Sequence, residues 1–209
     1  MSPSDIIQTI PTLDVTPHDR TNSIYSAFAQ DEVAIVATRL WLTIGAKLEH
    51  NNYTGLEVQP SVRVLWAPSS SQFVWGGISR AVRTPSLLET GFQYTGFLAA
   101  KPPTFVRIVG NPDFASKGLI GYEGGYRSAL TPQFYVDVAV FHDDHDNLQS
   151  LGALSVVAEA LPAPAHVLLA FPYANGVEGT SDGIEGHLHD TRRRSAPCSR
   201  CPGAGSSIR

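Results

Sequence analysis

The residue pattern with the clearest metal-binding chemistry is HDDHD at positions 142–146, which places imidazole nitrogens and carboxylate oxygens close together. Such donors can ligate a divalent cation when several of them converge on one point. Neighbouring side chains of an extended strand point to opposite faces, however, so His142, Asp143 and Asp144 cannot all converge. We therefore expect a solvated end of a strand, where it emerges into a loop, and we predict neither a metal site nor a cofactor.

Both cysteines of the chain lie close together near its end, as Cys198-x-x-Cys201. This spacing could supply half of a zinc site or a redox pair. A zinc site would need further ligands, and a redox pair would need a βαβ context, and the sequence offers neither. We attribute this cysteine pair to chance.

Nucleophilic catalysis needs a serine or cysteine beside a positioned base. The serines at 69–71 lie in a short predicted turn and lack the G-x-S-x-G elbow of the hydrolases. The adjacent carboxylates Asp31 and Glu32 would face opposite ways on a strand, so they cannot work as an acid and base pair. The sequence therefore predicts no catalytic residues and no enzymatic activity.

Composition narrows the class of protein further. The 209 residues are 43% hydrophobic and only 16% charged, below the roughly 25% usual for soluble domains. The formal net charge is −4, but the last twenty residues hold five arginines and one aspartate, which leaves −8 for the rest. An acidic body argues against binding to nucleic acid. The first residues, MSPSDIIQTIPTLD, lack the basic and apolar regions of a secretory signal.

Alternation of apolar and polar side chains is the strongest structural signal in the sequence. In the segment 39–49 the even positions are apolar, and the segment 54–66 continues the alternation for more than ten residues. The segment 133–144 alternates less regularly, and three further segments resemble strands whose glycines and alanines blur the two faces. We count about six strands, with a possible seventh near 175–187.

Strand and loop lengths favour a membrane barrel over a soluble sheet. Membrane-spanning barrel strands need about 9–11 residues, whereas strands of globular proteins usually run about 5–6. Short connections at 37–38, 67–71 and 130–132 alternate with mostly longer ones at 50–53, 83–117 and 147–174. This asymmetry is typical of a transmembrane β-barrel. A soluble antiparallel sandwich or barrel would alternate in the same way and stays open as an alternative.

Several short motifs occur in the order and spacing of a known family. The succession resembles the β-barrel of TonB-dependent outer-membrane receptors over residues 20–150 and, more loosely, 175–185. At two positions the chain departs from that family, with Lys117 where an acidic residue is common and His142 where tyrosine is common. The motifs that carry the resemblance are QDE at 30–32, QPS-x-R at 59–63, SRAVRTPS at 79–86, GNP at 110–112, YE at 122–123 and GYR at 125–127.

The resemblance implies an all-β fold, namely an antiparallel transmembrane β-barrel segment of about 6–7 strands from a parent barrel of about 22. It divides the chain into a lead-in at 1–22, a partial barrel at 23–189 and an anomalous basic tail at 190–209. We expect that tail to be disordered or encoded out of frame. We also expect that the chain is an internal fragment, without the plug domain and final strands of the family, and that it cannot form a pore alone.

The parent receptor would reside in the bacterial outer membrane, in contact with outer-membrane lipid. The resemblance implies energised uptake of a scarce ligand, of the iron-siderophore or cobalamin type, together with a plug domain and the TonB energy-coupling protein. It further implies that inward-facing polar residues contact the plug, whereas the outer loops at 83–117 and 147–174 select the ligand. The expected inward-facing residues are Lys47, Glu49, Glu57, Gln59, Arg63, Glu123 and Arg127.

Two other functions remain open on the sequence. One is a complete small outer-membrane barrel of about eight strands that acts as a binding or adhesion module, which would need an eighth strand. The other is a soluble β-sandwich binding protein. The apolar face that runs the length of segments 39–49 and 56–66 argues against the sandwich.

Overall fold

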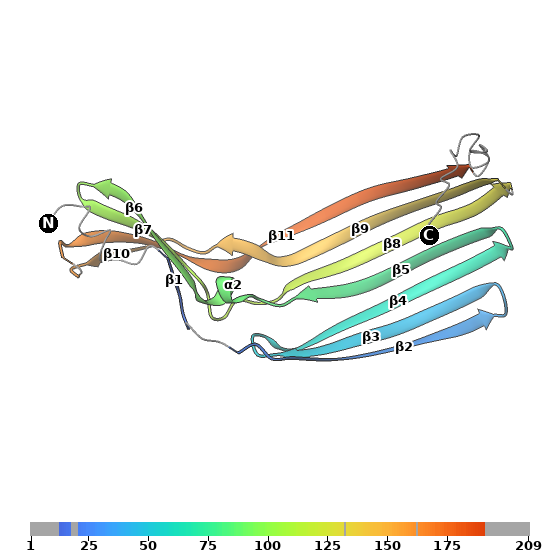
Figure 1. Cartoon of the computed structure of the whole chain (residues 1–209), viewed down its shortest axis with the longest axis horizontal. Coiled ribbons are helices and arrows are strands. Elements are labelled where there is room, and N and C mark those ends of the chain that lie inside the picture. The colour runs from blue at the N-terminus through green and yellow to red at the C-terminus, as the bar shows by residue number, and fades with distance from the viewer. Residues whose placement is uncertain (1–12, 18–20, 132, 162, 191–209) are drawn as a thin grey trace, which may run out of the picture.

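A computed structural model describes residues 13–17, 21–131, 133–161 and 163–190 of the chain. These residues form one eleven-stranded sheet and a short helix (Figure 1). The long strands are β2 (Ile24–Val36), β3 (Leu40–Asn51), β4 (Gly55–Ser69), β5 (Gln72–Arg83), β8 (Lys117–Thr131), β9 (Phe134–Leu151) and β11 (His166–Asp190). The shorter elements are β1 (Leu13–Val15), α2 (Leu87–Gly91), β6 (Phe92–Ala100), β7 (Pro103–Val109) and β10 (Ser155–Glu159).

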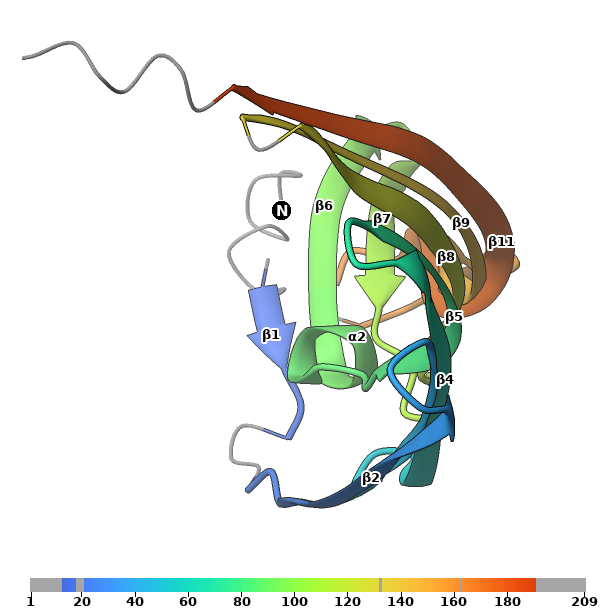
Figure 2. The same ribbon diagram turned by 90° about the vertical axis from the view of Figure 1, so that its right-hand side faces the viewer.

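The seven long strands form a curved wall, in the order β11-β9-β8-β5-β4-β3-β2, with antiparallel pairing between all neighbours. They are 12 to 25 residues long, which is enough to span a bilayer at the tilt of barrel strands. The wall curves like part of a barrel (Figure 2), and within the described residues β2 and β11 do not pair with each other. The predicted all-β barrel segment is confirmed, and the described strands do not form a closed small barrel.

Tight turns join the wall strands because polar and left-handed residues stand at the bends. Thr38 adopts a φ of 58° between β2 and β3, and Gly55 adopts a φ of 79° after the turn from β3. The buried side chain of Asn51 accepts hydrogen bonds from the backbone N–H of Tyr53 and of Thr54, each at 2.9 Å. The connection between β3 and β4 is therefore a three-residue turn at 52–54, shorter than the loop that its polar sequence suggests.

The two faces of the wall differ in chemistry. Strand β4 alternates between more exposed even positions and less exposed odd positions up to Ser61, as a single-layer wall with a convex and a concave face requires. The convex face exposes large apolar side chains that nothing in the described residues covers, and such a belt suits lipid. Its exposed members include Ile44, Leu48, Leu56, Val58, Val62, Val64, Trp66, Val74, Ile78, Val140 and Ile184.

Beyond one end of the wall, the shorter strands form a second sheet region that we call the lobe. It comprises β1, β6, β7, β10 and residues 166–172 of β11, and Figure 1 shows it on the left. β7 pairs with β11 in parallel, from Thr104 opposite Val167 to Val109 opposite Pro172. The small apolar core of the described residues lies here, where Phe105 contacts Leu168.

The lobe shows where the strand assignments from sequence fall short. The segment 83–117 is expected to be one loop but contains α2, β6 and β7, and the segment 147–174 contains β10 and the ends of β9 and β11. The expected seventh strand at 175–187 is the wall part of a longer strand, β11. The lobe strands are short and pair across large sequence distances, so local alternation does not reveal them.

We predict that arginine at position 62 destabilises the wall much more than arginine at position 61. Val62 lies on the convex face and Ser61 on the concave face, at the middle of β4. A lipid-facing arginine near the bilayer midplane costs about 2–4 kcal/mol of folding free energy. Denaturant titration of V62R and S61R barrels in lipid vesicles measures the difference, and equal destabilisation by the two variants would show that the faces are assigned wrongly.

Candidate functional site

The concave face of the wall collects the polar side chains that the sequence marks as inward-facing. Lys47 lies opposite Gln59 and Glu49 opposite Glu57 on the paired strands β3 and β4. On the neighbouring strands, Arg63 lies opposite Gly77, which in turn lies opposite Glu123. Because side chains alternate along a strand, this register places all seven expected residues, Arg127 included, on the same face.

Two arginines of this face are held by a carboxylate and an aromatic ring each. Nη2 of Arg63 is 3.6 Å from a carboxylate oxygen of Glu123, and its guanidinium lies 5.5 Å from the centre of the Trp75 ring. Arg127 donates from Nε and Nη2 to one oxygen of Asp137, at 3.1 and 2.7 Å. Both arginine side chains remain more than half exposed, at 61% and 51%. Each can therefore accept a further carboxylate from a partner inside the barrel.

The remaining expected residues form ion pairs nearer the lobe end of the wall. Nζ of Lys47 donates to Glu49 at 2.6 Å on the same strand. Glu57 accepts a hydrogen bond of 2.9 Å from the Thr54 hydroxyl and lies 3.8 Å from Nη2 of Arg80. The structure thus joins Arg63 with Glu123 but keeps these pairs separate from that cluster.

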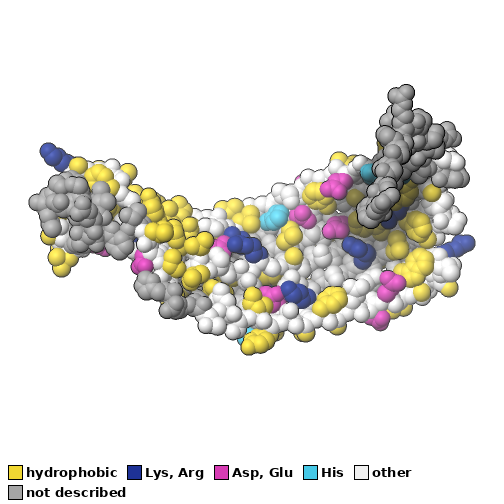
Figure 3. Space-filling view, viewed as in Figure 1, with side chains coloured by type: hydrophobic (Ala, Val, Ile, Leu, Met, Phe, Trp, Pro, Cys, Tyr) yellow, Lys and Arg dark blue, Asp and Glu magenta, His cyan; other side chains and the backbone are white. Residues whose placement is uncertain are grey.

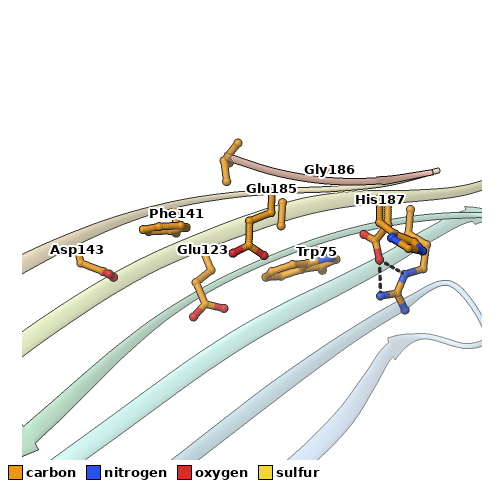
Figure 4. A pocket seen from close by; sticks show the side chains of 11 residues that line it. Trp75, Glu123, Phe141, Asp143, Glu185, Gly186 and His187 are labelled. Carbon is orange, nitrogen blue, oxygen red and sulfur yellow. Dashed lines mark hydrogen bonds and ion pairs between the residues drawn. The ribbon is translucent and has the colours of Figure 1, made fainter. Parts of the chain in front are cut away.

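A hollow of about 740 Å³ opens on the concave face between β5, β8, β9 and β11. Figure 4 shows the carboxylates of Glu123, Asp143 and Glu185 and the ring of Trp75 around it. A second hollow, of about 460 Å³, continues across β3, β4 and β5 and is lined by Glu32 and Arg63 among others. Together they make a polar trough, and Figure 3 shows charged side chains of both signs along it.

Asp137, Asp143, Glu185 and Trp75 belong to this trough but are absent from the residues expected to face inward. The alternation of the segment 133–144 already places Asp137 and Asp143 on one face, opposite the valines. That signal could have added both aspartates to the site. Glu185 could not be found this way, because glycines interrupt the alternation around it.

The HDDHD segment at 142–146 lies within β9, which continues to Leu151, so it is not the end of a strand as expected. Its side chains bind protein groups: His142 contacts Asp182 and Asp144, and Nε2 of His145 lies 3.2 Å from the Ser181 hydroxyl. Among the described residues, no group of three or more His, Cys, Asp or Glu side chains is arranged to hold a metal ion. Cys198 and Cys201 lie outside the described residues.

Membrane crossing by helices was also considered for the part of the chain that the structure describes. Its one helix, α2, has five residues, and no helix there combines the length and apolar character needed to cross a bilayer.

A cluster of ionic hydrogen bonds fastens the helix α2 to the wall, and we call it the rim cluster. One carboxylate oxygen of Glu89 accepts hydrogen bonds from Nη1 of Arg83 at 2.9 Å and from Nζ of Lys117 at 2.7 Å. The other accepts from the backbone N–H and the hydroxyl of Ser86, at 2.9 and 3.0 Å. The cluster therefore joins the end of β5, the start of β8 and the helix between them.

The Glu89 carboxyl is nearly buried, with 6% of its side chain exposed. Burial alone would raise its pKa, but the hydrogen bonds from Lys117, Ser86 and Arg83 outweigh burial and lower the pKa from 4.5 to about 2. Sequence reasoning missed this group, because its partners lie up to 28 residues away along the chain, at Lys117. Lys117 is the residue that departs from the common acidic one, and an acidic side chain there could not bind Glu89.

Comparison with protein families and curated proteins agrees with this architecture. Residues 2–191 match the family model described as TonB dependent receptor-like, beta-barrel. The iron-regulated outer membrane virulence protein of Vibrio cholerae is 27% identical over 124 residues, which is 59% of this chain. The chain spans only 18% of the length of that relative.

Solved structures of receptors share the fold of the described residues. The siderophore receptor PirA from Acinetobacter baumannii superposes with a TM-score of 0.69 at 15% identity, over 85% of this chain and 27% of the receptor. The ferric enterobactin receptor PfeA from Pseudomonas aeruginosa, a R480A mutant in complex with enterobactin, gives a TM-score of 0.67 at 21% identity, over 79% of this chain and 24% of the receptor. Both cover much more of this chain than of themselves.

The rim cluster predicts an acid-labile attachment of the helix to the wall. Because the pKa of Glu89 is lower in the folded protein than its ordinary 4.5, the cluster stabilises the fold fully above about pH 4.5 and loses this stabilisation as the pH falls towards about 2. Glu89→Gln removes the charge that Arg83 and Lys117 share and should cost about 2–3 kcal/mol at neutral pH. Limited proteolysis of the segment 84–116 between pH 7 and pH 2 measures both effects.

The matched control is Glu178→Gln, which changes an exposed carboxylate on β11. This variant should leave cleavage of the segment unchanged at every pH. If Glu89→Gln were cleaved no faster than the unmodified protein at neutral pH, the rim cluster would not hold the helix.

Proposed function

Because the chain belongs to the TonB dependent receptor-like β-barrel family, we propose that it forms part of the barrel wall of an outer-membrane receptor that takes up a ferric siderophore. The observation that carries the proposal is the pairing of an apolar convex face with a charged concave face over seven long strands. A wall with these two faces separates lipid from a water-filled or protein-filled interior. We infer that the protein resides in the outer membrane.

The ligand class is inferred from the relatives. The curated relative is named as iron-regulated, and the similar solved structures are named as a siderophore receptor and a ferric enterobactin receptor. These names support an iron chelate over a cobalamin, the other class that the family resemblance suggests. At the identities observed they support the class only, so the individual siderophore stays outside the proposal.

We further propose that the concave face supports a plug domain and does not itself bind the siderophore. Arg63 with Glu123 and Arg127 with Asp137 form half-exposed ion pairs in the middle of the wall, where a plug would lie. Each pair offers both charges to a partner, so it can form hydrogen bonds with a polar protein surface without a buried unpaired charge. Uptake would then depend on the plug and on the TonB energy-coupling protein.

Capture of the ligand would fall to the segments beyond the wall. The segments 84–116 and 152–165 leave the wall at the lobe end, opposite the short turns at 37–39 and 70–71 (Figure 1). In barrels of this class the long connections face the outside and the short ones face the periplasm. Loops on a rigid scaffold commonly carry recognition. The lobe is therefore the part of the described chain that we assign to the external side.

Uptake of radiolabelled iron tests the proposed function directly. Cells that contain the full-length receptor should take up a ferric siderophore with saturation, and deletion of its gene should abolish this uptake. Collapse of the proton gradient should stop accumulation but leave surface binding intact, because binding needs no energy. Iron uptake that is the same with and without the gene, over a panel of siderophores, would contradict the proposal.

Separate measurements of binding and uptake test the role of the concave arginines. We expect Arg63→Ala with Arg127→Ala to change the ligand Kd less than about twofold, because neither side chain is assigned to recognition. The uptake rate should fall about twofold to fivefold, as expected for the loss of two exposed ion pairs worth about 0.5–1 kcal/mol. Arg39→Ala, in the exposed turn after β2, is the control and should change neither quantity. A large loss of affinity with normal uptake per bound ligand would place the arginines in the ligand site.

A further inference from the structure

One histidine of the lobe is fully buried, although the other described features of the lobe give it no catalytic or metal-binding role. His166 begins β11, and its side chain has no exposed surface. Its ring lies 5.3 Å from the ring of Phe105 on β7, in an edge-to-face contact, beside the buried Leu168. His166 also pairs in register with Glu159 at the end of β10, next to the turn of the β10–β11 hairpin.

Both ring nitrogens of His166 face oxygen atoms that can only accept hydrogen bonds. Nδ1 is 3.2 Å from the carbonyl oxygen of Pro164, and Nε2 is 3.3 Å from a carboxylate oxygen of Glu159. The Nε2 contact is not aligned as a hydrogen bond, and that nitrogen has no other partner in the described residues. A neutral imidazole carries one N–H and can satisfy one of the two oxygens, whereas an imidazolium carries two. The surroundings therefore favour the protonated ring.

The charged groups on the strands around the ring are Glu159 and Arg107. Glu159 is the charged residue of β10 and Arg107 that of β7, while β6, with the sequence FQYTGFLAA, carries no charge. Nη1 of Arg107 is 3.8 Å from the other carboxylate oxygen of Glu159, and its Nε donates to the Thr95 hydroxyl at 3.1 Å. The Glu159 carboxylate thus lies between the guanidinium and the imidazole and offers one oxygen to each.

We propose that His166 makes the order of the lobe depend on pH, because its protonated ring fastens the β10–β11 hairpin through Glu159 and the Pro164 carbonyl. The stabilisation is present when the ring is charged and is lost as the pH rises through the range of about 5 to 8 in which histidines titrate. Above that range a buried carboxylate faces an unprotonated nitrogen, and the hairpin opens from its turn. This inference concerns the free protein, so it stands or falls independently of the ligand proposed above.

Hydrogen exchange followed by mass spectrometry, on the protein in outer-membrane vesicles without ligand, tests the inference. After correction for the intrinsic pH dependence of exchange, amides of residues 156–169 should exchange about tenfold more slowly at pH 5.5 than at pH 8. That factor is what one charge-assisted hydrogen bond can supply. Amides in the middle of β4 should show no such difference, since no histidine lies on that strand.

Two variants and one control separate a titrating role from a structural one. His166→Gln should abolish the difference between the two pH values, and Glu159→Gln should reduce it while protection at pH 8 stays close to that of the unmodified protein. His50→Gln, an exposed histidine of β3, should retain the full difference. Equal protection at the two pH values in the unmodified protein would overturn the inference. So would a full pH difference in either His166→Gln or Glu159→Gln, and the second variant keeps the test valid if the first unfolds the lobe.

Discussion

The structure depends on the pairing of every backbone N–H and C=O within a sheet that is one layer thick. Lipid offers no hydrogen-bond partner, so a polypeptide can cross it with strands only when neighbouring strands satisfy each other. β3 and β4 meet this requirement without a break, through twelve register pairs from Leu40 opposite Trp66 to Asn51 opposite Gly55. Because the backbone is fixed in this way, the alternation of side chains alone decides which face meets lipid and which faces inward.

The lobe follows a different logic, since it lies beyond the wall and has only a small apolar core around Phe105 and Leu168. Burial of so few side chains contributes little, so polar contacts set how the lobe is held. Glu89 joins the helix α2 to β5 and β8, and Asn175 accepts a hydrogen bond of 2.8 Å from the backbone N–H of Ala115. A small number of such contacts makes this end of the protein easier to reorganise than the wall.

Much of the wall could be predicted from the sequence, because a regular period of two over ten residues has few other physical explanations. Its signal is clear in β3 and β4, where Leu, Val and Ile alternate with charged side chains, and weaker in β11, where five glycines interrupt it. The lobe strands could not be predicted, since β7 pairs in parallel with a segment about 60 residues later. Glu89 and His166 stayed hidden for the same reason: their partners are near in space and distant or unremarkable in sequence.

The most direct test of the account is a cysteine scan along β4, from Leu56 to Trp66, in a full-length receptor whose native cysteines are replaced by serine. A membrane-impermeant thiol reagent labels cysteines that face water, whereas a lipid-soluble quencher reaches probes that face the bilayer. The account predicts labelling at odd positions such as Gln59 and Arg63, and quenching at even positions such as Val58 and Val62. Uniform labelling along the strand, or the opposite alternation, would contradict the central claim that this wall separates lipid from a polar interior.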